Sequence, residues 1–139
     1  MLLLARGTDH YPRAMMSYFM VFLGAGIGGA MRHGVNLAVT RGLGIQFPFG
    51  IMLINVLGCL SMGLIVGWLA LRGQAGQEWR LFLTTGVLGG FTTFSAFSLD
   101  AALLYERGEP GLAAVYVLGS VVLSLAAVFA GLWAVRQIG

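Results

Sequence analysis

Four long apolar stretches, joined by short connections, dominate this chain of 139 residues. A helix that crosses a bilayer needs about 20 mainly apolar residues. The stretches that meet this length are residues 18–40, 47–71, 81–104 and 111–135. The connections are too short to hold a soluble domain, and short connections make consecutive helices run antiparallel. The sequence therefore predicts an all-α integral membrane protein whose residues 18–139 form a single four-helix transmembrane domain.

Charged residues are too few for a soluble fold of this size. They make up 9% of the chain, whereas hydrophobic residues make up 58%, and a soluble domain carries about 25% charged residues. All the basic residues are arginines, and they are scattered singly without forming a patch, which argues against a nucleic-acid partner. The single cysteine, Cys59, excludes an internal disulfide and a multi-cysteine metal site. Lipid is the expected surrounding, and a multi-pass position in the cell (inner or plasma) membrane follows.

Residues 1–17 differ from the rest of the chain. An apolar piece, Met1 to Leu4, is too short for the core of a signal peptide, and polar and charged residues follow it. We interpret residues 1–17 as a disordered tail or an upstream extension, with Met15 or Met16 as an alternative start.

Counted from a start at Met15 or Met16, arginines are balanced between the two ends of the predicted bundle, whereas Arg6 and Arg13 would tip this balance. The end that holds both termini carries Arg72, Arg80 and Arg136, and the other end carries Arg41 and Arg107, with Arg32 inside the first span on that side. Orientation in a membrane follows arginine and lysine bias. A balanced chain can insert in both orientations and pair with an inverted copy of itself. Glycines four residues apart, which allow close helix packing in lipid, make an assembly plausible.

The third span contains the segment GVLGGFTTFSAFS at residues 86–98. Glycine is a poor helix former, threonine is stiff at its first side-chain torsion, and both threonine and serine compete for backbone hydrogen bonds. We predict that the helix breaks near residues 89–93. The alternative is an intact helix whose hydroxyl groups bond to their own carbonyls. A break in the middle of a span is typical of an ion or substrate site, because freed carbonyls need a partner.

Two other spans carry polar candidates. Asn55 is the only amide in the second span, and its NH2 group could face an anion or simply join two helices. In the fourth span, Tyr116, Ser120 and Ser124 follow each other at intervals of four residues. They would form a hydroxyl stripe about 12 Å long on one helix face. Serines of this kind can equally serve helix packing.

Two aromatic side chains and one arginine complete the set of candidates. Phe94 and Phe97 share a face if the helix resumes after the break. The edge of an aromatic ring is positive, so ring edges can line an anion path, although packing is the more usual role of such residues. Arg32 could reach the interface with its long side chain or attract anions into a vestibule.

These motifs resemble the Fluc (CrcB) family of fluoride channels over about residues 22–135. The strongest element is GGFTTFSAFS at residues 89–98, supported by GGAMR at residues 28–32 and NVLG at residues 55–58. Four positions depart from the family pattern. Ala96 stands where threonine or serine is common, Asp100 replaces a glutamate, His33 replaces a tyrosine, and Ile51 stands where threonine is frequent.

The resemblance implies a fluoride-selective passive channel that exports fluoride from the cytoplasm and relieves its toxicity. It implies a dual-topology homodimer of two antiparallel copies with two pores. It assigns the pore to residues Asn55, Phe94, Ser95, Phe97, Tyr116, Ser120 and Ser124. It assigns Arg32 to the vestibule. It also implies a structural sodium ion at the dimer interface, held by the backbone carbonyls of Gly89 and Thr92 from both copies.

Two other functions are compatible with a chain of this kind. A small proton-coupled multidrug exporter also has four spans, but it depends on a membrane carboxylate, normally in the first span. Here the first span has no acid, and Asp100 lies near the end of the third. A non-transporting assembly subunit would use its glycine faces only to bind other helices. No pair of nucleophile and base indicates hydrolysis, so we predict that the protein is not an enzyme.

Overall fold

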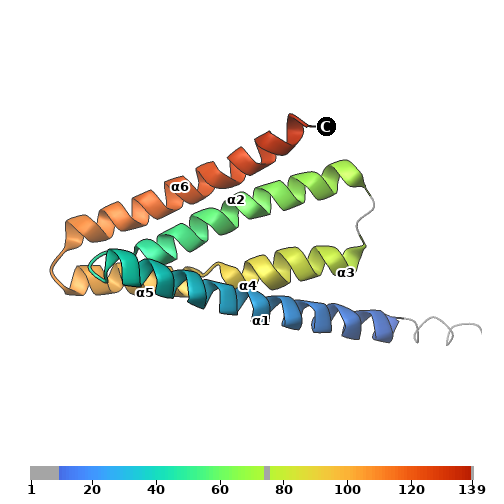
Figure 1. The fold of residues 1–139 in the computed structure, drawn as a ribbon, viewed down its shortest axis with the longest axis horizontal. Coiled ribbons are helices and arrows are strands. Elements are labelled where there is room, and N and C mark those ends of the chain that lie inside the picture. The colour runs from blue at the N-terminus through green and yellow to red at the C-terminus, as the bar shows by residue number, and fades with distance from the viewer. Residues whose placement is uncertain (1–9, 74–75, 139) are drawn as a thin grey trace, which may run out of the picture.

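The computed structural model describes residues 10–73 and 76–138, and the regular structure in these ranges is helical (Figure 1). The elements in chain order are α1 (His10–Leu43), α2 (Phe49–Arg72), α3 (Gln77–Arg80), the π-helix η1 (Leu81–Leu88), α4 (Gly89–Phe91), α5 (Phe94–Glu106) and α6 (Pro110–Arg136). The segment Gln77–Glu106, from α3 to α5, is one apolar span. With α1, α2 and α6 it gives four helices long and apolar enough to cross a membrane, which confirms the predicted fold class at this level.

The first helix begins earlier than predicted. α1 starts at His10, not at residue 18, so residues 10–17 of the expected tail are helical. Pro12 does not prevent this, because it lies in the first turn of α1. Backbone N–H groups in the first turn have no intrahelical partner, so the missing N–H of proline costs no helical hydrogen bond there. The tail prediction for residues 1–9 lies outside the described residues.

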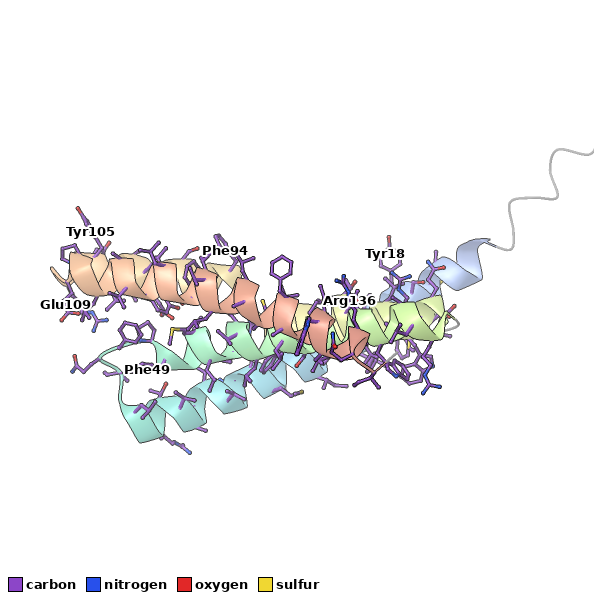
Figure 2. The ribbon with its side chains drawn as sticks, turned by 90° about the horizontal axis from the view of Figure 1, so that it is seen from above. Tyr18, Phe49, Phe94, Tyr105, Glu109 and Arg136 are labelled. Atoms are coloured by element: carbon purple, nitrogen blue, oxygen red, sulfur yellow. The ribbon has the colours of Figure 1, made fainter. Side chains whose placement is uncertain are left out.

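Consecutive spans run antiparallel, as predicted, and tight turns join them (Figure 1). Gly73 adopts a left-handed conformation, with φ of 63°, and its N–H donates to the carbonyl of Leu69 at the end of α2. Gly108, with φ of 78°, turns the chain between α5 and α6. Glycine has no Cβ and adopts positive φ without strain. Figure 2 shows Tyr18 and Arg136 at one end of the bundle, and Tyr105, Glu109 and Phe49 at the other.

The most extensive helix packing joins helices that are not consecutive in the chain: α1 lies on η1 and α4, and α2 lies on α6. Glycine makes the close approach possible. A Cβ atom placed on Gly24 would lie 2.8 Å from the Cα of Gly86, and one on Gly63 would lie 3.1 Å from the Cα of Gly131. Small residues at such contacts let helix backbones gain van der Waals packing in lipid. The glycines predicted to be packing positions therefore have that role within one copy.

The third span is broken near its centre, inside the predicted range. Thr92 (φ −79°, ψ 159°) and Thr93 (φ −156°, ψ 121°) are extended, and they separate α4 from α5. Figure 1 shows the unwound link between these two helices. The buried core lies beside this break, where α2, α5 and α6 meet around Ile54, Leu104 and Tyr116, each with no exposed surface. The core thus supports the second half of the broken span.

Candidate functional site

A pocket of about 390 Å³ opens beside the break, on the face formed by α2, α5 and α6. Its walls combine neutral polar groups with apolar side chains. The residues that line it are Asn55, Gly58, Cys59, Met62, Thr92, Thr93, Phe94, Phe97, Ser120, Val121, Ser124, Leu125 and Val128. Five of the predicted pore residues therefore come together: Asn55, Phe94, Phe97, Ser120 and Ser124. Among the described residues that line the pocket, no side chain is charged.

The amide of Asn55 holds the backbone of the break through two hydrogen bonds. The Thr93 N–H donates to Asn55 Oδ1 at 2.9 Å, and Asn55 Nδ2 donates to the Thr93 carbonyl at 3.1 Å. Backbone polar groups inside a membrane have no water to bond with, so a break must be satisfied by protein. Asn55 is therefore an interhelical link, one of its two predicted roles. Its NH2 group carries two hydrogens, and only one is used in this pair.

The hydroxyl of Thr93 caps the helix that follows the break. Thr93 Oγ1 accepts a hydrogen bond from the Ala96 N–H at 3.2 Å and lies 3.2 Å from the hydroxyl of Ser95. Threonine at the N-cap is favoured because its oxygen satisfies an N–H in the first helical turn. Sequence reasoning missed this role. The available signal was a threonine directly before an apolar helical run.

At the break, the N–H groups that would normally donate to two of the helical carbonyls have side-chain partners instead. In an unbroken α-helix the N–H of each residue donates to the carbonyl four residues earlier. The Thr93 N–H, which would bond to Gly89, bonds to Asn55 instead. The Ala96 N–H, which would bond to Thr92, bonds to the Thr93 hydroxyl instead. Gly89 and Thr92 are the two residues for which the family resemblance implies cation-binding carbonyls.

Aromatic rings form a continuous row along α5 and α6. The ring centroids of Phe94 and Phe97 lie 5.5 Å apart, and those of Phe97 and Tyr116 lie 5.3 Å apart. The two phenylalanines thus share a face, as expected. Their surroundings differ, since Phe97 is 8% exposed and Phe94 is 78% exposed. Figure 2 shows Phe94 projecting away from the helices of its own copy.

The hydroxyl groups of the fourth span divide into two environments. Ser120 is 3% exposed, and its buried Oγ has no hydrogen-bond partner among the residues that the structure describes, while Ser124 is half-buried further along the pocket. Tyr116 does not line this pocket: its hydroxyl donates to Asp100 Oδ2 at 3.4 Å. Asp100 lines a second pocket of about 290 Å³ at the end of α5, together with Arg107. The row of side chains from Phe97 through Tyr116 to Asp100 therefore connects the two pockets.

Three other predicted residues lie outside the main pocket. Ser95 is exposed on the first turn of α5, Gly89 is exposed at the start of α4, and Arg32 is half-buried on α1. No salt bridge involving Arg32 occurs within residues 10–73 and 76–138. Sequence reasoning also did not identify Cys59 and Met62 as pocket residues. Both lie on the same face of α2 as Asn55. Their sequence neighbours are apolar, so no polar pattern indicated a site there.

Comparison with known proteins gives a consistent result. The sequence model of the family described as CrcB-like protein, Camphor Resistance (CrcB), matches residues 19–132. The protein named fluoride-specific ion channel FluC 2 from Nitrobacter hamburgensis is 62% identical over 123 residues, which cover 88% of this chain and 99% of the relative. The fluoride-specific ion channel FluC from Methylobacterium nodulans is 61% identical over 125 residues, covering 90% of this chain and all of the relative. The chain therefore belongs to the CrcB family.

Proposed function

We propose that this protein is a passive, fluoride-selective ion channel of the plasma membrane. The relatives named fluoride-specific ion channels align along almost their whole length. The observation that carries the proposal is the pocket beside the break, where one amide, two phenylalanine rings and two serine hydroxyls meet without a charged side chain among the described residues. Such a lining suits an anion that must be bound and then released. The protein exports fluoride from the cytoplasm down its electrochemical gradient and so relieves fluoride toxicity.

Neutral donors account for conduction in physical terms. Fluoride holds its water tightly, so a pore must replace that water with several hydrogen-bond donors. The free hydroxyl of Ser120, the second amide hydrogen of Asn55 and the positive ring edges of Phe94 and Phe97 supply them. Conduction requires binding that is weak and spread over several sites. A fixed cation inside the pocket would instead hold the ion in place.

The proposed working unit is a homodimer of two antiparallel copies, with two pores. Phe94 presents 78% of its surface on the open side of the pocket, and Ser120 has an unpaired hydroxyl there. A second copy would close the pocket and leave each pore lined by both chains. Counted from Met15 or Met16, the balance of arginines between the two ends supports insertion in both orientations.

A structural sodium ion fits the break. Carbonyl oxygens are suitable ligands for hard cations. The carbonyls of Gly89 and Thr92 have lost their helical donors, because Asn55 and the Thr93 hydroxyl take the two N–H groups. The bound ion would supply positive charge to oxygens that lack hydrogen-bond donors, and an antiparallel partner would contribute its own pair. Arg32 is proposed to attract anions to the vestibule by its charge.

Fluoride efflux from liposomes tests the proposed function directly. Proteoliposomes loaded with potassium fluoride, with valinomycin added to carry potassium, are expected to release fluoride within seconds, while liposomes loaded with potassium chloride retain chloride. A fluoride electrode and a chloride electrode measure the two fluxes. Release of neither ion would contradict a channel. Proton-dependent efflux of a cationic dye that is lost in Asp100→Asn would support a drug exporter instead.

Labelling of single cysteines tests the antiparallel arrangement. In a Cys59→Ser background, Tyr18→Cys and Tyr105→Cys place a thiol at opposite ends of the bundle, where both side chains are exposed. Dual insertion predicts that a membrane-impermeant maleimide added to sealed cells labels about half of each variant. A single orientation predicts complete labelling of one variant and none of the other, which would contradict the proposed dimer.

A further inference from the structure

Two hydrogen bonds at Thr93 decide where the third span stops being a helix. One is the bond from the Thr93 N–H to Asn55 Oδ1, and the other is the bond from the Ala96 N–H to Thr93 Oγ1. Each takes an N–H away from a helical carbonyl partner. The second bond is made by the threonine side chain itself, so a single hydroxyl group competes with the Thr92 carbonyl for the same donor.

We propose that Thr93 is the positioning residue that keeps the Thr92 carbonyl open for a cation. This inference rests on the proposed sodium site. It assigns to that site a residue that lines the pocket but is neither a proposed ligand nor one of the pore residues that the resemblance implies. Without the Thr93 hydroxyl, the Ala96 N–H would be left unpaired. Inside a membrane an unpaired N–H is strongly disfavoured. The simplest way to satisfy it is a bond to the Thr92 carbonyl, which rewinds the helix and removes that oxygen from the cation site.

The neighbouring threonine does not have this role. Thr92 Oγ1 donates to the carbonyl of Leu88, one turn back in the same span, at 2.9 Å. That bond leaves the Ala96 N–H untouched. The methyl group of Thr92 packs against Gly58, where an added Cβ would collide with it. Thr93 is 8% exposed, so its methyl group is also buried. At Thr93, valine preserves shape and methyl contacts and removes only the hydroxyl.

The same change at Thr84, in η1, is the matched control. The Thr84 hydroxyl donates to the Arg80 carbonyl one turn back in the chain, at 2.7 Å, and Thr84 does not line the pocket.

Sodium binding to the purified full-length protein tests the inference. Equilibrium binding of ²²Na⁺ would be measured on wild type, Thr93→Val, Thr93→Ser and Thr84→Val. Thr93→Val is expected to weaken sodium binding about tenfold, which equals about 1.4 kcal/mol and lies within the range for a lost helix cap. Thr93→Ser keeps the hydroxyl and is expected to bind within about twofold of wild type. Thr84→Val is the matched control and is expected to bind normally.

Each outcome separates the inference from the proposed function. If Thr93→Val binds sodium as wild type does, or if Thr84→Val weakens binding equally, the role of Thr93 is wrong and the sodium site stands. If wild type conducts fluoride but binds no sodium, the proposed cation is wrong, and the inference fails with it. If Thr93→Val does not assemble, as judged by gel filtration, Thr93→Ala provides the same comparison with a smaller side chain.

Discussion

Phe94→Ile is expected to lower fluoride efflux at least about a hundredfold, a loss of about 2.7 kcal/mol, without weakening the fold. Phe94 is 78% exposed and lies outside the buried core, so isoleucine removes little packing within one copy. It does remove an aromatic ring from the pocket. An aliphatic side chain has no positive edge to offer a dehydrated anion. The measurement is the initial rate of fluoride release from proteoliposomes, together with the melting temperature in detergent.

Phe129→Ile is the matched control. Phe129 lies on α6, is 66% exposed and does not line the pocket. The same change in volume and aromaticity is therefore expected to leave efflux near the wild-type rate. Equal efflux from wild type and Phe94→Ile would contradict the pore assignment. Equal losses in Phe94→Ile and Phe129→Ile would mean that the effect comes from general packing and not from the pocket.

Asn55→Asp is the second change with a large expected effect, and it should both abolish measurable efflux and lower stability. The carboxylate can still accept from the Thr93 N–H, but it cannot donate to the Thr93 carbonyl as Nδ2 does at 3.1 Å. Two oxygens would then face each other without a hydrogen between them. The negative charge would also repel fluoride in the pocket. Breaking one half of a buried polar pair costs about 1–3 kcal/mol.

Cys59→Ser is the control for this position. Cys59 lies one helical turn after Asn55 on α2 and lines the same pocket, but no hydrogen bond from its side chain to the break occurs in the described part of the chain. Serine is similar in size and neutral. Fluoride release is expected to stay within about threefold of wild type, because no charge enters and no pair is broken. Wild-type efflux from Asn55→Asp would show that the pair at the break is not required for conduction.

The break could be predicted from sequence because its cause is local. Adjacent glycines followed by two threonines weaken a helix whatever surrounds them, and the extended residues Thr92 and Thr93 lie within the predicted range. The four spans were predictable for a similar reason, since length and apolar content alone decide whether a helix can cross a bilayer. The early start of α1 could not be predicted, because nothing in residues 10–17 by themselves requires a helix. They are helical as a continuation of the apolar span that follows them.

The partner of the break could not be predicted. Asn55 and Thr93 are 38 residues apart, and their two hydrogen bonds depend on how α2 packs beside the third span. The sequence left two roles open for the amide for that reason. The different exposure of Phe94 and Phe97 was equally out of reach. Three-residue spacing predicts a shared face, but only packing decides which ring points into the core.

The side-chain amide of Asn55 offers an N–H donor and a C=O acceptor, as a peptide group does. It pairs with the backbone of Thr93 as a neighbouring β-strand would. The N–H and the carbonyl of Thr93 are thereby satisfied inside a single copy, while the Gly89 and Thr92 carbonyls lack their helical donors. A newly made chain can adopt its broken span as soon as α2 and the third span meet, before any second chain arrives. In the proposed dimer, pairing would then join two preorganised surfaces, and the ordering of the break would not reduce the affinity between them. Biogenesis of the channel would separate into folding first and pairing second.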